Sequence, residues 1–311
     1  MKTLLGIDHG NRNIKTANFV FTSGYTVSKL KPTFAQTDTI YYNGKYYTIS
    51  GEAFPFILDK TETENYFILT LFGIAKELDA KGMPSGKYEL KLGVGLPPRH
   101  LAALRDKFGK YFKERGTLSI QYKNRVYEIM IKDALVFPQC FSAVAAFEEK
   151  ARRIINDYDF CLLIDIGGYT VDIVEMRDGK PLPDKCLSLE LGVNKMVDDI
   201  ASNILNDYTY QISPTMIENI LKQSGKKTTL PDEVVREIRK QADEWISKIL
   251  NKIREHGYDT RIIPAIFLGG GVSVFGNAID NSSLLGVHEK VENICINALG
   301  YEKAYRIISA A

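Results

Sequence analysis

The strongest constraint on the fold is a nine-residue pattern that occurs twice, at an interval of about half the chain. Ile7–Lys15 (IDHGNRNIK) aligns without a gap with Ile164–Asp172 (IDIGGYTVD). In both copies an apolar run ends in Asp, a Gly follows two positions later, and a small polar residue precedes a β-branched one. Asp8 and Asp165 are 157 residues apart (165 − 8) in a chain of 311. The sequence therefore predicts two related halves built around equivalent turns.

Each copy has the pattern of a β-hairpin with a turn rich in Gly or Asn, where positive φ is favourable. The expected strand pairs are Thr3–His9 with Ile14–Phe21, and Phe160–Ile166 with Thr170–Met176. Either turn alone is also typical of an ordinary hairpin. The duplication favours a shared role, in which the two turns hold one polyphosphate from both sides.

The residues of these turns suit phosphate binding. Successive backbone N–H groups in a Gly-rich turn form a concavity that binds anions. The absence of Cβ at Gly10, Gly167 and Gly168 permits close approach of phosphate oxygens, and Lys15 adds a positive charge.

The aspartates at the two strand ends suit a metal. Asp8 and Asp165 supply the hard carboxylate oxygens that Mg²⁺ prefers, together with phosphate oxygens and water. Two carboxylates facing a triphosphate would repel it, so this interpretation requires the metal.

The rest of the chain alternates strands and helices, which predicts an α/β sandwich in each half. Asn43-Gly44 marks a hairpin over Thr39–Ile49. Pro231 begins a long helix, and Trp245 on the apolar face of that helix is expected to pack in the hydrophobic core. The other strands are expected at Tyr88–Gly95, Leu118–Tyr122, Arg125–Ile131 and Ile262–Leu268. The other helices are expected at Ile68–Leu78, His100–Phe112, Gln139–Lys150, Val193–Tyr208 and Pro214–Gln223.

Three consecutive glycines, Gly269, Gly270 and Gly271, follow the expected strand Ile262–Leu268. They permit close approach of a flat or charged ligand, although a simple loop has the same composition. The spacing is not GxGxxG, which disfavours a dinucleotide-binding Rossmann fold.

Composition limits the partners and the compartment. Forty basic and 38 acidic side chains leave a formal charge of +2, and no basic block indicates direct binding to nucleic acid or to a membrane. The four cysteines are scattered without zinc-like spacing, which is typical of free thiols in a reducing cytosol. The apolar run before Asp8 is too short for a signal peptide, and none reaches the roughly 20 residues of a membrane span. We expect a cytoplasmic protein.

In five segments the chain resembles the actin and sugar-kinase superfamily, and within it the plasmid-segregating actin-like ATPases of the ParM type. IDHGNRNIK and LLIDIGGYTVDIVEM are similar to the two phosphate motifs, and IFLGGGVSVFGN to the adenosine motif. VFPQCFSAVAAFEE and NALGYEKAY are similar to the two connecting segments. The resemblance implies an actin-like fold, with two related α/β domains that have ribonuclease H-like cores and flank a nucleotide cleft. Domain I would span 1–149, with 298–311 returning to it, and domain II would span 150–297.

The resemblance also implies site residues, carried over by position. Asp8 and Asp165 would lie around Mg²⁺ and its waters, and Gln139 would orient the attacking water, since an amide is too weak a base to deprotonate it. The first phosphate turn would be formed by Gly10, Asn11, Arg12, Asn13 and Lys15, and the second by Gly167, Gly168, Tyr169 and Thr170. Gly269, Gly270 and Gly271 would pack against the adenosine, with Lys222 near the base. His9 and Arg12 make the first turn bulkier and more basic than the family pattern, and Arg12 either contacts phosphate or points to solvent.

The resemblance implies a slow ATPase that binds ATP or GTP with Mg²⁺ and assembles head to tail into filaments. It would move plasmid or phage DNA through an adaptor protein bound to centromere-like DNA, without touching the DNA itself. One alternative is a small-molecule or sugar kinase of the same superfamily, which would need an aspartate base and a sugar pocket. Another is a monomeric ATP-dependent chaperone or assembly scaffold.

Overall fold

The computed structural model describes residues 2–33, 38–222 and 225–310. The chain divides into two compact units, each with its own hydrophobic core. Unit 1 comprises Met1–Ala146 and Cys295–Ala311, and unit 2 comprises Phe147–Ile294. Within the described ranges, no helix is both long and apolar enough to span a bilayer.

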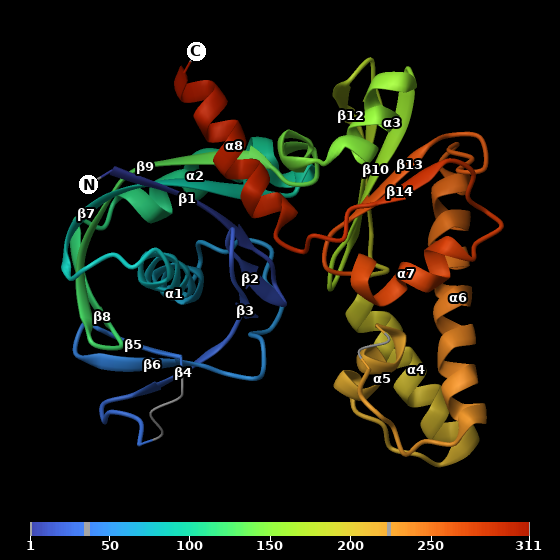
Figure 1. The fold of residues 1–311 in the computed structure, drawn as a ribbon, viewed down its shortest axis with the longest axis horizontal. Coiled ribbons are helices and arrows are strands. Elements are labelled where there is room, and N and C mark those ends of the chain that lie inside the picture. The colour runs from blue at the N-terminus through green and yellow to red at the C-terminus, as the bar shows by residue number, and fades with distance from the viewer. Residues whose placement is uncertain (1, 34–37, 223–224, 311) are drawn as a thin grey trace. The chain divides into compact units, whose positions relative to one another are not determined.

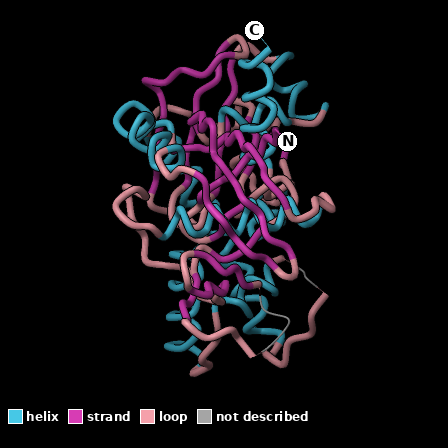
Figure 2. The backbone as a smooth tube through the Cα atoms, turned by 90° about the vertical axis from the view of Figure 1, so that its left-hand side faces the viewer, coloured by secondary structure: helices cyan, strands magenta, loops and turns pink. Residues whose placement is uncertain are grey.

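Unit 1 is built on a sheet that curls around one helix. Its strands follow the order β3-β2-β1-β7-β9-β8-β5-β6-β4. The outermost strands, β3 and β4, are consecutive in the sequence, and Figure 1 shows the sheet nearly closing around α1 (Asn65–Ala80). Figure 2 shows strands (magenta) running through the molecule from the side. Twelve of the 16 residues of α1 are buried, as expected for a helix that is apolar nearly all round. The strands are β1 (Lys2–His9), β2 (Asn13–Lys15), β3 (Val20–Thr22), β4 (Tyr25–Ser28), β5 (Thr39–Tyr42), β6 (Lys45–Ile49), β7 (Gly86–Leu96), β8 (Thr117–Tyr122) and β9 (Arg125–Pro138).

Two further helices pack on this sheet. Helix α2 (Pro98–Lys113) begins at a proline and buries Phe108 and Phe112. Helix α8 (Ile296–Ala310) packs on β1 and β7, where the ring of Tyr301 lies so close to Gly95 that a Cβ there would be 2.0 Å from its hydroxyl oxygen. A short 3₁₀ helix, η1 (Phe141–Ala146), follows β9.

Unit 2 has a smaller sheet, in the order β12-β11-β10-β13-β14. Its core is formed with the helices, and Trp245 packs there as predicted, with its indole N–H donating to the Leu191 carbonyl at 3.0 Å. The strands are β10 (Phe160–Ile166), β11 (Val171–Arg177), β12 (Lys180–Leu189), β13 (Ala265–Leu268) and β14 (His288–Lys290). The helices are α3 (Glu149–Asp157), α4 (Val193–Tyr208), α5 (Pro214–Leu221), α6 (Asp232–Glu255) and α7 (Val272–Asp280).

The strand pairing of the two units is equivalent. In each, an antiparallel hairpin is followed by a parallel strand on the side of its first member: β2-β1-β7 in unit 1 and β11-β10-β13 in unit 2. The pairing register places Asp8 opposite Lys15, and Asp165 opposite Asp172. Both residues of the second pair lie 157 positions after their counterparts, so the internal repeat is present in the backbone. The α/β class predicted from the sequence is confirmed.

The expected strand Ile14–Phe21 is wrong, because β2 and β3 are separated by a tight turn in which the Thr16 amide donates to the Phe19 carbonyl at 2.8 Å. The buried carboxylate of Glu77 stabilises this turn, since it accepts from the Thr16 hydroxyl at 2.6 Å and the Asn18 amide at 3.0 Å.

The expected helix Gln139–Lys150 is also wrong. Cys140 has φ of +66°, which no helix accommodates, and only the 3₁₀ helix η1 follows it. Glu148 is extended, with φ −75° and ψ 170°, and α3 starts after it. This break coincides with the boundary between the two units.

The expected strand Ile262–Leu268 is shorter than predicted. Pro264 has no N–H to pair, and Ile262 and Ile263 donate to the Asp259 carbonyl in a turn. The strand therefore begins at Ala265, and Ile262 is 82% exposed.

Candidate functional site

The first aspartate turn joins two residues of the first hairpin to Gln139, which is more than 120 residues away in the sequence. Asp8 ends β1 and is 2% exposed. Its Oδ2 accepts from Lys15 Nζ at 2.9 Å, and its Oδ1 accepts from Gln139 Nε2 at 2.8 Å. Lys15 lies on the paired strand β2, and Gln139 follows β9, on the far side of β7. We call Asp8, Lys15 and Gln139 the Asp8 cluster.

The charges around the cluster keep Asp8 ionised. Burial raises the pKa of Asp8, but the nearby Lys15 and Lys60 ammonium groups outweigh it and hold that pKa below its ordinary value. Burial, with the charge of Lys60, lowers the pKa of the neighbouring His9 to about 3. His9 is therefore neutral near pH 7, and the turn contains a carboxylate and an ammonium group side by side.

The first turn itself is held by contacts on several sides. A Cβ on Gly10 would lie 2.6 Å from the Asn13 carbonyl oxygen, so only glycine fits there. The Ser23 hydroxyl donates to the Gly10 carbonyl at 2.5 Å, and the Ser23 amide donates to the Arg12 carbonyl at 3.0 Å. Arg12 is half-buried, and the Asn11 side chain accepts from a tyrosine hydroxyl of α1. The predicted residues Gly10, Asn11 and Arg12 thus lie in one fixed turn, and Asn13 begins β2 directly after it.

The second turn directs a row of amide groups to one side. The carbonyls of Gly167, Gly168 and Tyr169 accept from the first amides of α4 and its cap, at 3.1, 2.8 and 3.1 Å. In a planar trans peptide the N–H points opposite to the C=O. The N–H groups of Gly168, Tyr169 and Thr170 therefore point away from α4. Three successive amides on one side form the kind of concavity that binds an anion.

The two turns also share local geometry. The Gly167 amide donates to the Thr170 carbonyl at 2.8 Å, and a Cβ on Gly167 would lie 3.1 Å from that oxygen. This is the contact that Gly10 makes with Asn13, displaced by the same 157 residues. The Thr170 hydroxyl donates to the Asp172 carboxylate at 3.1 Å, where unit 1 has Lys15 instead.

The glycine run packs against the second aspartate. Gly269 has φ of +90°, and a Cβ there would lie 2.1 Å from Asp165 Oδ1. The Gly271 amide donates to the Ile166 carbonyl at 2.8 Å, and a Cβ on Gly271 would meet the Ile166 side chain at 2.3 Å. Gly270 has room for a Cβ, at 3.4 Å from Ile294. Gly269 and Gly271 are thus required by packing within unit 2, whatever ligand approaches them.

Lys222, which the sequence predicted near the base, pairs with a residue of its own helix. It caps the end of α5, and its ammonium group pairs with Glu218 at 2.7 Å. Among the described residues, no hydrogen bond or ion pair links Lys222 to the other predicted site residues. Gln223, the expected end of this helix, lies outside the described residues.

The chemistry of the turns fits a magnesium ion held largely through water and phosphate. The described residues contain no group of three or more His, Cys, Asp or Glu side chains that would hold a metal alone. Asp8 already has a partner on each oxygen, which fits an outer position better than direct ligation. Hard carboxylates combined with phosphate oxygens and water are the ligand set that Mg²⁺ prefers.

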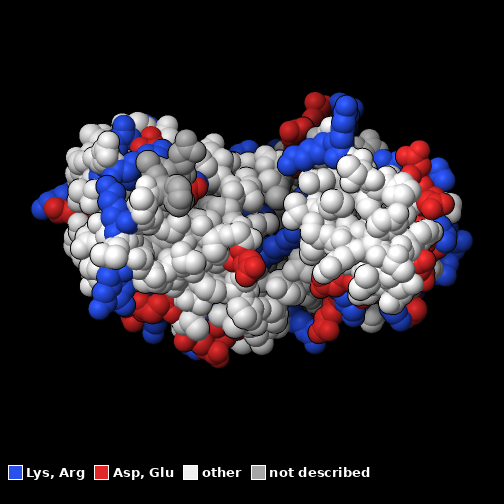
Figure 3. Space-filling model, turned by 90° about the horizontal axis from the view of Figure 1, so that it is seen from below, with Lys and Arg blue, Asp and Glu red and all other residues white. Residues whose placement is uncertain are grey.

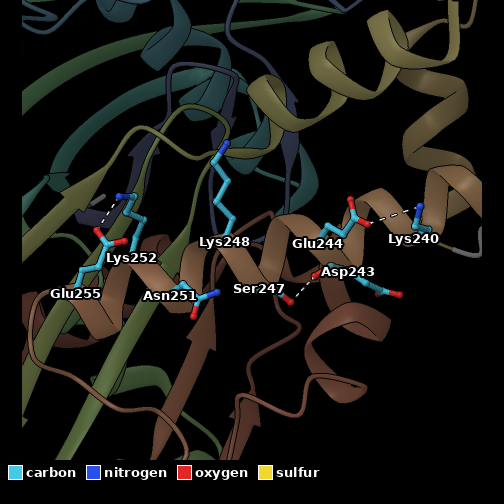
Figure 4. A pocket seen from close by; sticks show the side chains of 8 residues that line it. All are labelled: Lys240, Asp243, Glu244, Ser247, Lys248, Asn251, Lys252 and Glu255. Carbon is cyan, nitrogen blue, oxygen red and sulfur yellow. Dashed lines mark hydrogen bonds and ion pairs between the residues drawn. The ribbon is translucent and has the colours of Figure 1, made fainter. Parts of the chain in front are cut away.

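A shallow pocket on unit 2 lies on the solvent-exposed surface of one helix and is not a second functional site. It runs along the exposed face of α6, and Figure 4 shows that its lining side chains project from that one helix. Lys240 pairs with Glu244 at 3.8 Å, and Lys252 with Glu255 at 2.7 Å. Internal ion pairs at helical spacing are typical of a solvated face.

Sequence reasoning missed Lys60, Tyr66 and Gly192. Gly192 lies so close to the second turn that a Cβ would be 2.4 Å from the Tyr169 carbonyl carbon. Its place before the first periodic residue of α4 was a usable cap signal. Lys60 and Tyr66 contact the first turn from more than 50 residues away, and no spacing rule marks them.

Comparisons with known proteins agree with this architecture. Residues 6–141 match the family model for the N-terminal domain of actin-like proteins, and residues 163–281 match that for the C-terminal part of MreB-like archaeal actin homologues. No curated protein matches in sequence at a significant level.

Solved structures match over the whole chain. The archaeal actin homologue Ta0583 is 20% identical with a TM-score of 0.74, covering 98% of this chain and 99% of that one. The ParM of Bacillus thuringiensis with ATP is 15% identical with a TM-score of 0.69, covering 99% of each chain. A filament structure of Alp12 is 16% identical with a TM-score of 0.66, covering 100% of this chain and 99% of that one. At these identities the likeness shows the fold.

Proposed function

Since the chain belongs to the actin-like proteins and has their fold, we propose that it is a nucleotide-dependent ATPase that assembles with copies of itself. The turns headed by Asp8 and Asp165 would bind the phosphate chain of ATP or GTP together with Mg²⁺. The bound ion would neutralise charge between the carboxylates and the phosphates.

The observation that carries this proposal is the geometry of the second turn. Three successive N–H groups, of Gly168, Tyr169 and Thr170, point to one side because their carbonyl partners bond the start of α4. The equivalent turn of unit 1 adds Lys15 and the ionised Asp8. A polyanion with a divalent cation suits each of these two sets of groups.

Gln139 would position the attacking water. Only the amino group of an amide donates to a carboxylate, so the bond to Asp8 fixes Nε2 there and leaves Oε1 as an acceptor. An amide oxygen accepts a hydrogen bond from water but is too weak a base to remove its proton. We therefore expect slow hydrolysis, limited by positioning alone.

Opposite charges on the two units support head-to-tail self-association. Unit 1 has 22 Lys and Arg against 14 Asp and Glu, a formal charge of +8, whereas unit 2 has 18 against 24, a charge of −6. Contact between unlike units of successive copies is attractive, and such a heterologous contact continues into a filament. Figure 3 shows that on one face charged side chains surround a broad uncharged area of unit 2, so the charge is not spread evenly.

The biological role that we propose is DNA segregation through an adaptor protein. The support is likeness of fold to a ParM, with no basic block for direct DNA binding. Tethered-DNA pull-downs with and without an added DNA-binding adaptor protein test it. Capture of the filament by bare DNA would contradict the adaptor step.

The test of the proposed activity is turnover and light scattering with Mg-ATP and no added acceptor. We expect slow phosphate release and a rise in scattering at tens of micromolar protein, both lost in Asp165→Ala. Asp199→Ala, which removes an exposed aspartate of α4, is the matched control and should behave as wild type. Turnover only after adding a sugar would favour a kinase instead, and turnover without scattering would remove the filament.

A further inference from the structure

A polar stripe on an otherwise apolar buried helix lies against the first turn. Tyr66, Thr70, Gly73 and Glu77 of α1 are spaced i, i+4, i+7 and i+11, which places them on one face. All four are buried inside the curled sheet of unit 1. Burying polar groups in a helix core is unfavourable unless each has a partner.

Each polar member of the stripe contacts the hairpin that contains the first turn. The Tyr66 hydroxyl donates to Asn11 Oδ1 at 2.7 Å. The Thr70 hydroxyl lies 2.7 Å from His9 Nε2, and Glu77 accepts from the Thr16 hydroxyl at 2.6 Å. A Cβ on Gly73 would lie 3.1 Å from the Thr16 methyl group, so α1 packs closely on Thr16 at this point of the stripe.

Lys60 adds a buried positive charge beside the stripe. It is 6% exposed, its ammonium group donates to the His9 carbonyl, and it lies 5.3 Å from the centre of the Tyr66 ring. His9 is the residue between Asp8 and Gly10, so this bond fixes the backbone on which both depend. A long side chain with a buried ammonium group loses much entropy and hydration, and the bond to the turn is what offsets that cost.

We infer that Lys60 and Tyr66 are positioning residues for the first phosphate turn. Lys60 holds the His9 carbonyl, Tyr66 holds the Asn11 side chain, and the turn between them is fixed from behind, on the side of α1. Through Asp8 this also fixes Gln139, so the water-positioning amide depends on two residues that do not touch it. The inference rests on the proposed nucleotide function.

Turnover and nucleotide affinity separate positioning from general stabilisation. The first variant, Tyr66→Phe, removes one hydroxyl from an intact ring. We expect kcat for ATP to fall about fivefold or more, with ADP affinity changed less than the fall in kcat, because the turn of unit 2 still binds phosphate. The matched control is Tyr88→Phe, which removes a buried hydroxyl that donates at 2.7 Å to the Pro84 carbonyl, in the same unit but away from the turn.

The second variant, Lys60→Met, keeps the length of the side chain and removes its charge and donor. Its control is Lys107→Met, which removes an exposed lysine that pairs with Asp59, the residue before Lys60. We expect Lys60→Met to lower kcat by about tenfold or more and Lys107→Met to leave it within about twofold.

Equal kcat in Tyr66→Phe, Tyr88→Phe and wild type would overturn the inference, as would kcat and ADP affinity falling by the same factor. A wild-type protein that neither binds nor hydrolyses nucleotide would instead refute the proposed function.

Discussion

Lowering the pH from 7 to 5 should destabilise unit 1 through one residue, His9. Its imidazole is fully buried, stacks on Phe112 with ring centres 5.1 Å apart, and contacts Thr70 at 2.7 Å. Burial, reinforced by Lys60, lowers the pKa of His9 to about 3, whereas the unfolded chain has the ordinary value of 6.5. Because the unfolded state takes up the proton first, this stability is complete above pH 6.5 and is lost as the pH falls toward 3.

The size of the effect follows from that difference in pKa. Each pH unit below 6.5 lowers the free energy of unfolding by about 1.4 kcal/mol, so about 2 kcal/mol of stability should be lost between pH 7 and pH 5. Asp8 does not contribute between pH 7 and pH 5, because its carboxylate is ionised there in both states: the unfolded chain has the ordinary pKa of 3.8, and the folded protein has a lower pKa.

Urea unfolding at pH 7 and at pH 5 measures this loss of stability. Far-UV circular dichroism follows both units, and the fluorescence of Trp245, the single tryptophan, follows unit 2. We expect the transition of unit 1 to shift to lower urea at pH 5, and that shift to shrink in His9→Gln, which has no proton to gain. The exposed His256→Gln is the control and should keep the wild-type shift. The same pH shift in His9→Gln as in wild type would refute the reasoning.

Three further results are expected. Gly269→Ala should abolish nucleotide binding or folding, since the added Cβ would meet the Asp165 carboxylate. Its control is Gly257→Ala, which has a similar φ of +93° with open space around it and should lower the free energy of unfolding only by the backbone strain of about 1 kcal/mol. Equal unfolding free energies in the two variants would contradict the contact between Gly269 and Asp165. Gln139→Ala should lower ATP turnover about tenfold or more while ATP affinity stays within about threefold, compared with the exposed control Gln121→Ala; unchanged turnover would exclude water positioning. Raising the salt from 50 to 300 mM should weaken Mg-ATP-dependent scattering, because opposite charges attract between copies, and stronger scattering would contradict that contact.

The repeat made the central geometry predictable from the sequence. A gapless match between two Asp-x-Gly turns predicted equivalent hairpins, and the pairing of Asp8 with Lys15 and of Asp165 with Asp172 confirms their equivalence. Local patterns of this kind carry their own geometry, because turn residues and alternation fix the register of a hairpin.

Features set by distant contacts were not predictable. The strand break after Lys15 depends on Glu77, a carboxylate contributed by a helix some 60 residues later. The helix expected from Gln139 fails because of Cys140, whose positive φ no composition rule marks. Lys60 and Tyr66 lie outside every element expected from the sequence, since the expected helix begins at Ile68, so no local pattern places them beside the turn. The roles of the individual site residues stay predictions until ligand binding is measured.

The most direct test of the central claim is a double-mutant cycle on Mg-ATP affinity, with Asp8→Asn, Asp165→Asn and both together, followed by a fluorescent ATP analogue. If one magnesium nucleotide is held by both turns, each single change weakens binding about tenfold or more, and the double change weakens it further than either single change. Wild-type affinity in either single variant would contradict a shared site.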